Sequence, residues 1–227
     1  MTYAHFPFYA IGFRANPFQV LTDEEWVEVA VIPSSLQKMI GQTTGHIQLV
    51  GAMGHGKSTT LLAARVRMVA SGQAVELEYI PRGQHRLTTR LEDVSALILD
   101  EAQRLWPWEW WRLLRWAKKP EHRLIFSSHV DMRLAFQLIR LKLTTCPLDY
   151  SVCLAEILQH RLAYFALEDP PPITLAPDAI AYLEDSYGAN LRAIQYFLYE
   201  VFQRFPSCGA LTADGLCAVA NDLQATK

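Results

Sequence analysis

The stretch Gly51-Ala52-Met53-Gly54-His55-Gly56-Lys57-Ser58 decides the fold, because it fits the pattern GxxxxGK(S/T) without a mismatch. The apolar run 46–50 before it predicts a strand, and residues 57–70 after it predict a helix. Glycines let the backbone of such a loop turn its N–H groups toward phosphate oxygens, and the helix N-terminus adds a favourable dipole. Strand, loop and helix together therefore predict a phosphate-binding site. The alternative is a glycine-rich turn that carries a lysine by chance.

Each polar residue of this loop has an expected contact with a nucleotide. Lys57 would neutralise the β and γ phosphates, Ser58 would offer Mg²⁺ a hard oxygen ligand, and Thr59 would reach the α phosphate. The expected nucleotide-binding residues are Gly51, Ala52, Met53, Gly54, His55, Gly56, Lys57, Ser58 and Thr59, with Val31 and Ile32 as candidate contacts of the base.

A second acidic motif supports this prediction. The apolar run 96–99 ends in Asp100 and Glu101. Ligands of a parallel sheet bind at the carboxyl ends of its strands, so we expect Asp100 beside Mg²⁺ and Glu101 where it polarises an attacking water. The alternative is that the two acids only open the next helix.

The rest of the chain alternates between short apolar runs and helical patterns, which predicts a parallel sheet flanked by helices. We expect further strands at 74–80, 94–99, 123–126 and 143–148, and further helices at 108–118 and 131–141. After residue 150 only helical patterns remain, at 154–166, 178–187, 191–205 and 213–223. The expected organisation is a lead-in segment over 1–30, an α/β core over 31–149 and a small all-helical domain over 150–227.

Composition excludes several classes of protein. With 51% hydrophobic residues and 19% charged ones among 227, the chain is not disordered, and its net charge of −2 excludes a globally basic nucleic-acid binder. No run is long enough to span a membrane and no signal peptide is evident, so we expect a cytoplasmic protein without membrane contacts. The four cysteines lack metal-ligand spacing and are expected to be reduced thiols.

With these motifs the chain resembles the AAA+ ATPases. Residues 51–58 match their Walker A loop, and Asp100-Glu101-Ala102-Gln103 matches their Walker B motif. Ser127-Ser128-His129 stands where the family keeps its sensor 1 residue, Ser128 being the first choice and Ser127 the second. Gly188-Ala189-Asn190-Leu191-Arg192 resembles the sensor 2 motif of the helical lid and makes Arg192 the expected γ-phosphate contact.

The resemblance also implies how the protein works. ATP and Mg²⁺ are the implied cofactors, and hydrolysis would depend on a homo-oligomer in which a neighbour supplies an arginine finger. Arg133 and Arg140 are the candidates on the helix expected after sensor 1, and Arg140 is preferred.

Within this family, LILDEAQRL over 97–105 is similar to the TniB, TnsC and MuB transposition regulators and to ExeA-type secretion ATPases. The transposition regulators imply a ring or filament on duplex DNA that recruits a transposase or adaptor protein. The alternatives are a secretion or signalling ATPase that binds no DNA, a P-loop small-molecule kinase, and a scaffold switched by nucleotide.

The short link between the second and third strands is the expected DNA contact. Arg82, Arg86 and Arg90 recur every four residues, so a helical turn would place them on one face, and the related regulators imply phosphate contacts here. A solvated surface loop is the alternative.

The tryptophan-rich segment 106–116 leaves two interpretations open. Trp110, Leu113, Leu114 and Ala117 fit one face that packs on the sheet. The remaining tryptophans then suggest a subunit or partner interface, unless the whole helix is buried.

Overall fold

The computed structural model describes residues 8–41, 45–148, 150, 153–204 and 208–225. These residues form two compact units, which we name the core unit (32–149) and the helical unit (1–31 with 150–227). The expected end of the α/β core at residue 149 and the first seven residues of the expected lead-in lie outside the described residues. None of the helices in the described ranges has the length and hydropathy of a membrane span.

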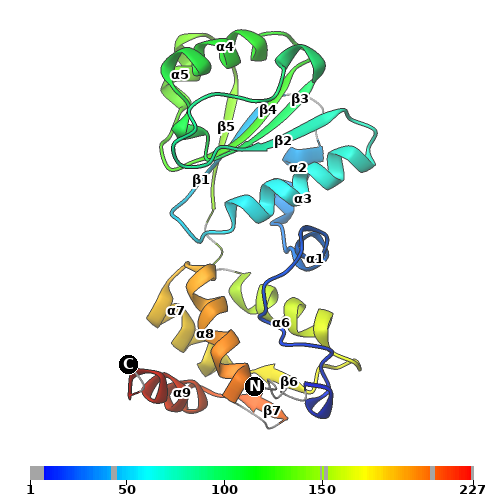
Figure 1. The fold of residues 1–227 in the computed structure, drawn as a ribbon, viewed down its shortest axis with the longest axis vertical. Coiled ribbons are helices and arrows are strands. Elements are labelled where there is room, and N and C mark those ends of the chain that lie inside the picture. The colour runs from blue at the N-terminus through cyan, green and yellow to red at the C-terminus, as the bar shows by residue number, and fades with distance from the viewer. Residues whose placement is uncertain (1–7, 42–44, 149, 151–152, 205–207, 226–227) are drawn as a thin grey trace. The chain divides into compact units, whose positions relative to one another are not determined.

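The core unit contains a five-stranded sheet in the order β2-β3-β4-β1-β5, in which every neighbouring pair is parallel (Figure 1). Its strands are β1 (His46–Val50), β2 (Val75–Tyr79), β3 (Ala96–Asp100), β4 (Arg123–Ser128) and β5 (Leu143–Pro147). Its α-helices are α2 (Ser34–Gly41), α3 (Lys57–Ala70), α4 (Pro107–Ala117) and α5 (Arg133–Leu138), with 3₁₀ turns η2 (Leu91–Asp93) and η3 (Ala102–Arg104). The expected strands are confirmed, with ends shifted by two residues at most.

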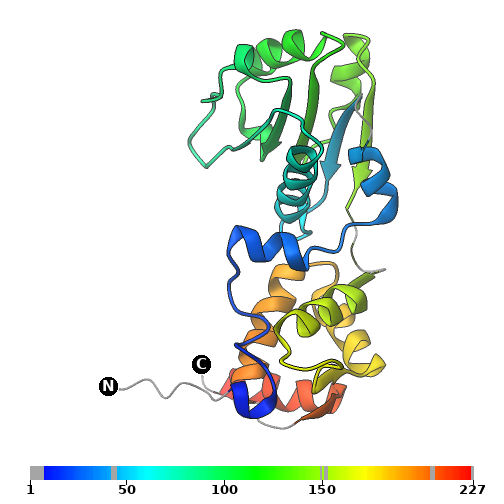
Figure 2. The ribbon, with the colours of Figure 1, turned by 90° about the vertical axis from the view of Figure 1, so that its right-hand side faces the viewer.

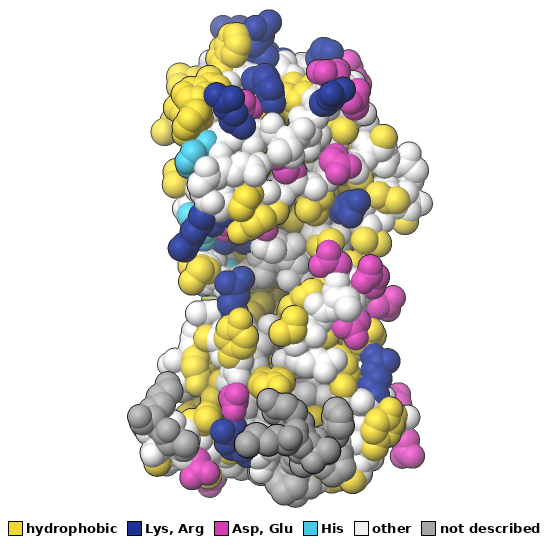
Figure 3. All heavy atoms as spheres, viewed as in Figure 1, with side chains coloured by type: hydrophobic (Ala, Val, Ile, Leu, Met, Phe, Trp, Pro, Cys, Tyr) yellow, Lys and Arg dark blue, Asp and Glu magenta, His cyan; other side chains and the backbone are white. Residues whose placement is uncertain are grey.

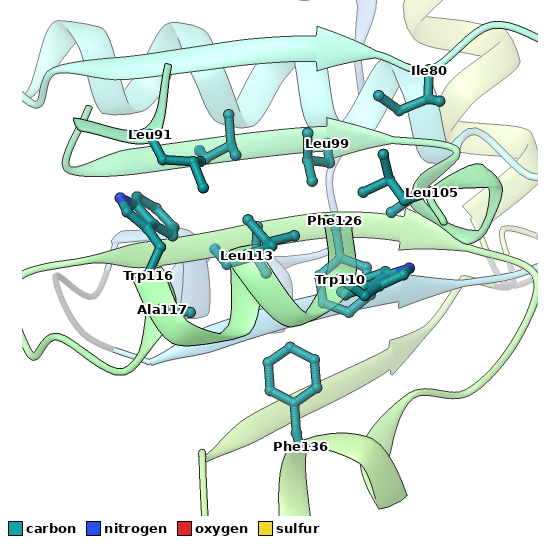
Figure 4. Close-up of a cluster of buried hydrophobic side chains, with 13 residues drawn as sticks. Ile80, Leu91, Leu99, Leu105, Trp110, Leu113, Trp116, Ala117, Phe126 and Phe136 are labelled. Atoms are coloured by element: carbon teal, nitrogen blue, oxygen red, sulfur yellow. The ribbon is translucent and has the colours of Figure 1, made fainter. Parts of the chain in front are cut away.

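Two layers of helices cover this sheet. Helix α3 packs across β2, β3 and β4 on one face, and α2 packs against α3. Helix α4 covers the other face, where Trp110 and Leu113 contact a cluster that includes Leu97, Leu99 and Phe126 (Figure 4). Side chains alternate between the two faces along a strand, and every residue of β3 is buried. This burial on both faces explains the unbroken apolar run over 96–99.

Of the two interpretations of the tryptophan-rich segment, the structure favours a helix with one buried and one exposed face. Trp110, Leu113 and Ala117 are buried, whereas Trp108 and Trp111 are 51% and 61% exposed. Trp116 is also buried, at the end of the helix, and this was not expected. Proline at the first helical position starts α4 without losing a hydrogen bond, because that N–H has no partner within a helix.

Two segments differ from expectation. The link between β2 and β3 is an irregular loop that ends in η2, so Arg82, Arg86 and Arg90 do not share a helical face (Figure 2). Helix α5 spans only Arg133–Leu138, and Arg140 lies beyond its end with a left-handed φ of 58°.

The helical unit combines the lead-in with the C-terminal part of the chain. Its elements are η1 (Phe8–Ile11), α1 (Asp23–Val29), α6 (Leu154–Phe165), β6 (Ile173–Leu175), α7 (Pro177–Tyr187), α8 (Leu191–Arg204), β7 (Gly209–Leu211) and α9 (Ala213–Ala225). The capping box expected from Thr22 and Glu25 opens α1. Two three-residue strands, β6 and β7, pair in parallel and were not expected, because such short strands show no periodicity.

One buried arginine ties the lead-in to α6. Arg161 is 2% exposed, and its guanidinium donates to the carbonyl oxygens of Pro17 and Gln19. It also lies over the rings of Phe18 and Trp26, at 5.6 and 5.1 Å from their centroids. Burial lowers the pKa of Arg161 to about 10, so the guanidinium remains charged at neutral pH.

Candidate functional site

The phosphate loop joins β1 to α3 and takes its shape from two glycines. Gly54 and Gly56 have φ of 87° and 71°, in the left-handed region where a side chain would be strained. Helix α3 begins at Lys57, and the first N–H groups of a helix point outward from its N-terminus, where an anion can accept from them. The ammonium of Lys57 donates to the carbonyl oxygens of Gly51 and Ala52 at 2.7 and 2.8 Å. The lysine that would neutralise phosphate is therefore held against the loop that would bind it.

The hydroxyls of the first turn of α3 face different surroundings. Ser58 is exposed and Thr59 half-buried, so both remain accessible to a ligand at the loop. The next residue, Thr60, is buried, and its hydroxyl donates to the Gly56 carbonyl at 2.8 Å. The metal contact of Ser58 and the phosphate contact of Thr59 stay predictions, while Thr60 closes the loop.

Position 51 must remain small. A Cβ there would lie 3.2 Å from the Leu148 carbonyl oxygen and 3.3 Å from the Cβ of His55. His55 itself makes a 3.1 Å hydrogen bond from Nδ1 to the same Leu148 oxygen, which ties the loop to the segment after β5. Backbone approach, rather than φ, is the reason for glycine at this point of the loop.

The two acids lie at the carboxyl end of β3, as expected. Asp100 is 5% exposed and is hydrogen-bonded through Oδ1 to the hydroxyl of Ser127, on β4. The same hydroxyl accepts from the N–H of Glu101 at 2.9 Å. Ser127 thus holds both acids, and β4 lies between the strand that carries them and the strand that carries the phosphate loop.

Glu101 is strongly restrained. Its φ of 61° is in the left-handed region, where residues other than glycine are uncommon. One carboxylate oxygen, Oε2, pairs with Arg104 at 2.7 Å and accepts from Gln103 at 2.9 Å. The other, Oε1, lies 3.6 Å from Nε2 of His129. The carboxylate is therefore positioned by three neighbours, and backbone strain of this kind often marks a functional residue.

His129 links the acids to the phosphate loop. Its Nδ1 lies 2.9 Å from the carbonyl oxygen of Gly51, and because a carbonyl only accepts, Nδ1 carries the proton. The imidazole therefore spans from the loop to the carboxylate of Glu101. The sequence drew attention to the Ser127-Ser128-His129 segment without assigning a role to the histidine.

The neighbouring serine, Ser128, faces the other way. Its hydroxyl accepts from Gln48 Nε2 at 2.7 Å and donates to the Val130 carbonyl at 2.5 Å. Gln48 lies on β1, is fully buried, and also donates to the Val130 carbonyl at 2.6 Å. This network joins β1 to the end of β4. Successive side chains of a strand point to opposite faces, so only one of the two serines can reach Asp100. Ser127, the second choice for the sensor 1 residue, contacts the acids and the first choice, Ser128, does not, while the sensor role itself stays a prediction.

Asp100 and Ser58 carry oxygen atoms of the kind that a divalent cation binds. Within the described residues no cationic side chain lies within ion-pair distance of Asp100, although its carboxylate is buried. Buried carboxylates are normally paired or bound to a metal, and carboxylate and hydroxyl oxygens are ligands that Mg²⁺ prefers. These two side chains are therefore the candidates to hold Mg²⁺ together with a nucleotide.

The arginines expected at the active site differ in their surroundings. Arg133 is exposed and pairs with Asp131 at 2.6 Å. The hydrogen bonds between the two side chains lower the pKa of Asp131 and raise the pKa of Arg133. Arg140 is exposed as well, and no ion pair of it occurs among the described residues. Arg192 lies in the first turn of α8, in the helical unit. Its role and the choice of finger stay predictions.

The two candidate base contacts fall in different units. Ile32 is buried in the core unit, and its carbonyl accepts from Gln37 at 2.7 Å. Val31 is half-buried and groups with the helical unit. Their contact with a base also stays a prediction.

The expected DNA contact lies next to exposed aromatic side chains. Arg82, Arg86 and Arg90 are all exposed, and Arg86 lies 5.6 Å from the ring centroid of Trp106. The ring of His85 stacks on the same Trp106, with ring centroids 5.2 Å apart. Figure 3 shows hydrophobic and basic side chains close together over α4 and α5. This part of the core unit therefore offers cations and rings together.

Besides His129, two further residues of the site, Gln48 and Arg104, were not predicted from the sequence. Gln48 was hidden in an apolar strand, and a buried amide there is a signal that β1 contacts a polar network. Arg104 follows Glu101 by three residues, the spacing at which side chains meet on a helical turn. Both signals were present locally, but the partners of Gln48 come from β4 and beyond.

No protein-family model matches the chain, and no curated protein matches its sequence. Solved structures do match its fold. AMPPCP-bound DnaA from Aquifex aeolicus has a TM-score of 0.61 at 18% identity, over 91% of this chain and 72% of that one. DnaA bound to AMPPCP and single-stranded DNA has 0.59 at 17%, over 91% and 70%. A RuvB mutant from Thermotoga maritima has 0.58 at 13%, over 93% and 74%. The chain therefore has the α/β fold of AAA+ ATPases.

Proposed function

We propose that the protein is a Mg²⁺-dependent ATPase that assembles on duplex DNA when nucleotide is bound and regulates a transposase. The observation that supports ATP hydrolysis best is the arrangement at the carboxyl edge of the sheet. There the phosphate loop follows β1, while Asp100 and Glu101 stand at the end of β3, and β4 between these strands supplies the Ser127 hydroxyl that contacts both acids. Asp100 is buried without a cationic partner among the described residues, and Glu101 is positioned by its neighbours.

Each residue has a distinct task in this proposal. The N–H groups at the start of α3 bind phosphate oxygens, and Lys57 exchanges the carbonyls of Gly51 and Ala52 for the β and γ phosphates. Ser58 and Asp100 hold Mg²⁺, which would supply positive charge to the phosphates. Glu101 accepts the proton of the attacking water, oriented by Arg104 and His129.

The remaining assignments rest on the family resemblance. Arg192 from the helical unit and an arginine of a neighbouring copy, Arg140 in preference to Arg133, would contact the γ phosphate. Binding to DNA is supported by the exposed Arg82, Arg86 and Arg90 and by the fold shared with a DnaA whose structure contains single-stranded DNA. The transposition role rests on the similarity of residues 97–105 to the transposition regulators.

Particle mass and shape test the assembly. The protein is mixed with Mg²⁺ and a slowly hydrolysed ATP analogue, with and without duplex DNA, at low and moderate salt, and examined by mass photometry and negative-stain imaging. Rings or filaments should require both nucleotide and DNA, and Lys57→Ala should prevent them. The variant with Arg82, Arg86 and Arg90 all changed to Gln should keep nucleotide binding and lose the response to DNA. A monomer that ignores DNA contradicts the proposal and favours a kinase or a protein-directed switch.

Capture from cells tests the partner. Glu101→Gln should trap the nucleotide-bound assembly, because binding persists when the base is lost. A transposase or transposition adaptor should copurify with that variant and not with Lys57→Ala. Recovery of secretion or signalling components instead would contradict the transposition role while leaving the ATPase assignment intact.

A further inference from the structure

A pocket of the core unit lies away from the phosphate loop, between the second half of α4 and the loop that ends in η2. Its volume is about 440 Å³, within the ~300–1,000 Å³ of small-ligand sites. The phosphate loop follows the carboxyl end of β1, whereas η2 precedes the amino end of β3. The pocket is therefore separate from the nucleotide site.

Positive charge dominates the lining of this pocket. Arg90 from the loop and Arg115 and Lys119 from α4 and the residues after it line the pocket, and Glu92 is the acid among the lining residues. Within the described ranges no carboxylate lies within ion-pair distance of these three cations. A fourth lining cation, Arg112, is neutralised by Glu109 at 3.0 Å. The lining thus retains more positive than negative charge.

A buried hydrogen-bond donor also lines the pocket. Trp116 is 7% exposed, and its buried indole Nε1 has no hydrogen-bond partner in the part of the chain that the structure describes. Stacking on His122, with centroids 4.4 Å apart, fixes the ring, and its nitrogen lies on the side away from Leu113 (Figure 4). Cations in the last turn of a helix also complement the helix dipole, but that effect does not account for an unpaired indole N–H.

The opposite wall of the pocket is held in place by a buried acid. Thr88 donates to Oε1 of Glu78 from its N–H at 2.7 Å and from its hydroxyl at 2.9 Å, and the N–H of Thr89 donates to Oε2 at 2.9 Å. Burial alone would raise the pKa of Glu78, but these hydrogen bonds outweigh burial and lower it. The carboxylate therefore stays ionised and keeps the loop beside α4.

We propose that this pocket binds a phosphate group, which accepts a hydrogen bond from Trp116 Nε1–H and is neutralised by Arg90, Arg115 and Lys119. Guanidinium groups match the geometry of phosphate oxygens, and an anion supplies the acceptor that the indole lacks. The group belongs either to a free phosphorylated compound or to a DNA backbone. The DNA source alone rests on the proposed function.

The Trp116 indole N–H reports on binding directly. The full chain with ¹⁵N-labelled tryptophan is titrated with inorganic pyrophosphate and, separately, with duplex DNA. The Trp116 signal is assigned from Trp116→Phe or, where that variant does not fold, from through-space contacts with Leu91. Pyrophosphate should move the Trp116 signal in a saturable manner. Replacing both Arg115 and Lys119 with Gln should raise the apparent Kd about tenfold or more, because two charged contacts are lost.

Matched controls separate this pocket from the nucleotide site. Arg82→Gln removes an exposed arginine of the same loop outside the pocket, and Lys57→Ala disables the phosphate loop. Both should leave the Trp116 response to pyrophosphate unchanged. A response to DNA at equal salt identifies the backbone as the source, and a response to pyrophosphate alone identifies a free phosphate compound. No Trp116 response to either probe, or a response unchanged by the Arg115 and Lys119 substitutions, overturns the inference whether or not the protein hydrolyses ATP.

Discussion

Ser127→Ala should lower ATP turnover, whereas Ser128→Ala should lower stability and leave turnover nearly unchanged, although the two residues are adjacent and equally buried. Ser127 donates to the Asp100 carboxylate and accepts from the N–H of Glu101 at 2.9 Å. That N–H keeps a second bond to Asp100 at 3.0 Å, so the main loss in Ser127→Ala is one hydrogen bond to a charged group. Such a bond contributes about 1.5–3 kcal/mol. If this free energy is lost from the stabilisation of the transition state, turnover falls by about 10- to 150-fold.

Ser128→Ala removes contacts of a different network. Its hydroxyl bonds to Gln48 and to the Val130 carbonyl, and Gln48 keeps its own bond to that carbonyl. We expect a loss of about 1–2 kcal/mol in the free energy of unfolding and little change in turnover.

The assay measures ATP turnover with Mg²⁺ and duplex DNA, nucleotide affinity, and the free energy of unfolding in urea for both variants and the parent protein. Comparison of turnover at saturating nucleotide separates a catalytic loss from weaker binding. Equal loss of turnover in Ser128→Ala and Ser127→Ala, or turnover like that of the parent in Ser127→Ala, would contradict this assignment. Either result would mean that the carboxylates are positioned independently of the hydroxyl seen beside them.

Three further predictions follow from single side chains. Glu101→Gln should bind nucleotide like the parent and lose about 10²–10⁴-fold in turnover, because the general base is removed; surviving turnover would show that another group accepts the proton. Leu113→Ala, at a fully buried position of α4, should lower the free energy of unfolding by about 2–5 kcal/mol in urea titration, and a smaller loss would show that the cluster collapses around the cavity. Burial lowers the pKa of His46, whose Nδ1 accepts from the Leu124 N–H at 3.1 Å, so the unfolded chain binds the extra proton and stability is lost as the pH falls below about 6.5. His46→Gln should flatten the dependence of unfolding free energy on pH below that value, and an unchanged slope would assign it to other groups.

The local sequence was enough to predict the main strands and helices and the phosphate loop. The positions of β1, α3 and β3 follow from apolar periodicity and from a loop whose glycines must adopt left-handed φ, and each of these signals lies within a few residues of its effect. The burial of Trp110 and Leu113 follows in the same way, because the spacing of side chains along a helix decides which face meets the sheet. These features needed no knowledge of distant partners.

Other features depend on partners far away in the chain. The link before β3 is an irregular loop because Glu78 binds Thr88 and Thr89, and a helical pattern of arginines could not compete with that contact. The lead-in groups with residues 150–227 because Arg161 holds its carbonyls. Sequence periodicity carries no information on such pairings.

The sequence by itself determined the phosphate loop, the pair of acids and the order of strands and helices, because short-range sterics and hydrophobic spacing decide them. Tertiary structure alone decided which serine meets Asp100, that His129 links the loop to Glu101, and that Arg90 and Trp116 line one pocket. The physical reason is that the strand pleat and the pairing of β3 with β4 set the direction of each side chain. That direction becomes defined only when the sheet is assembled.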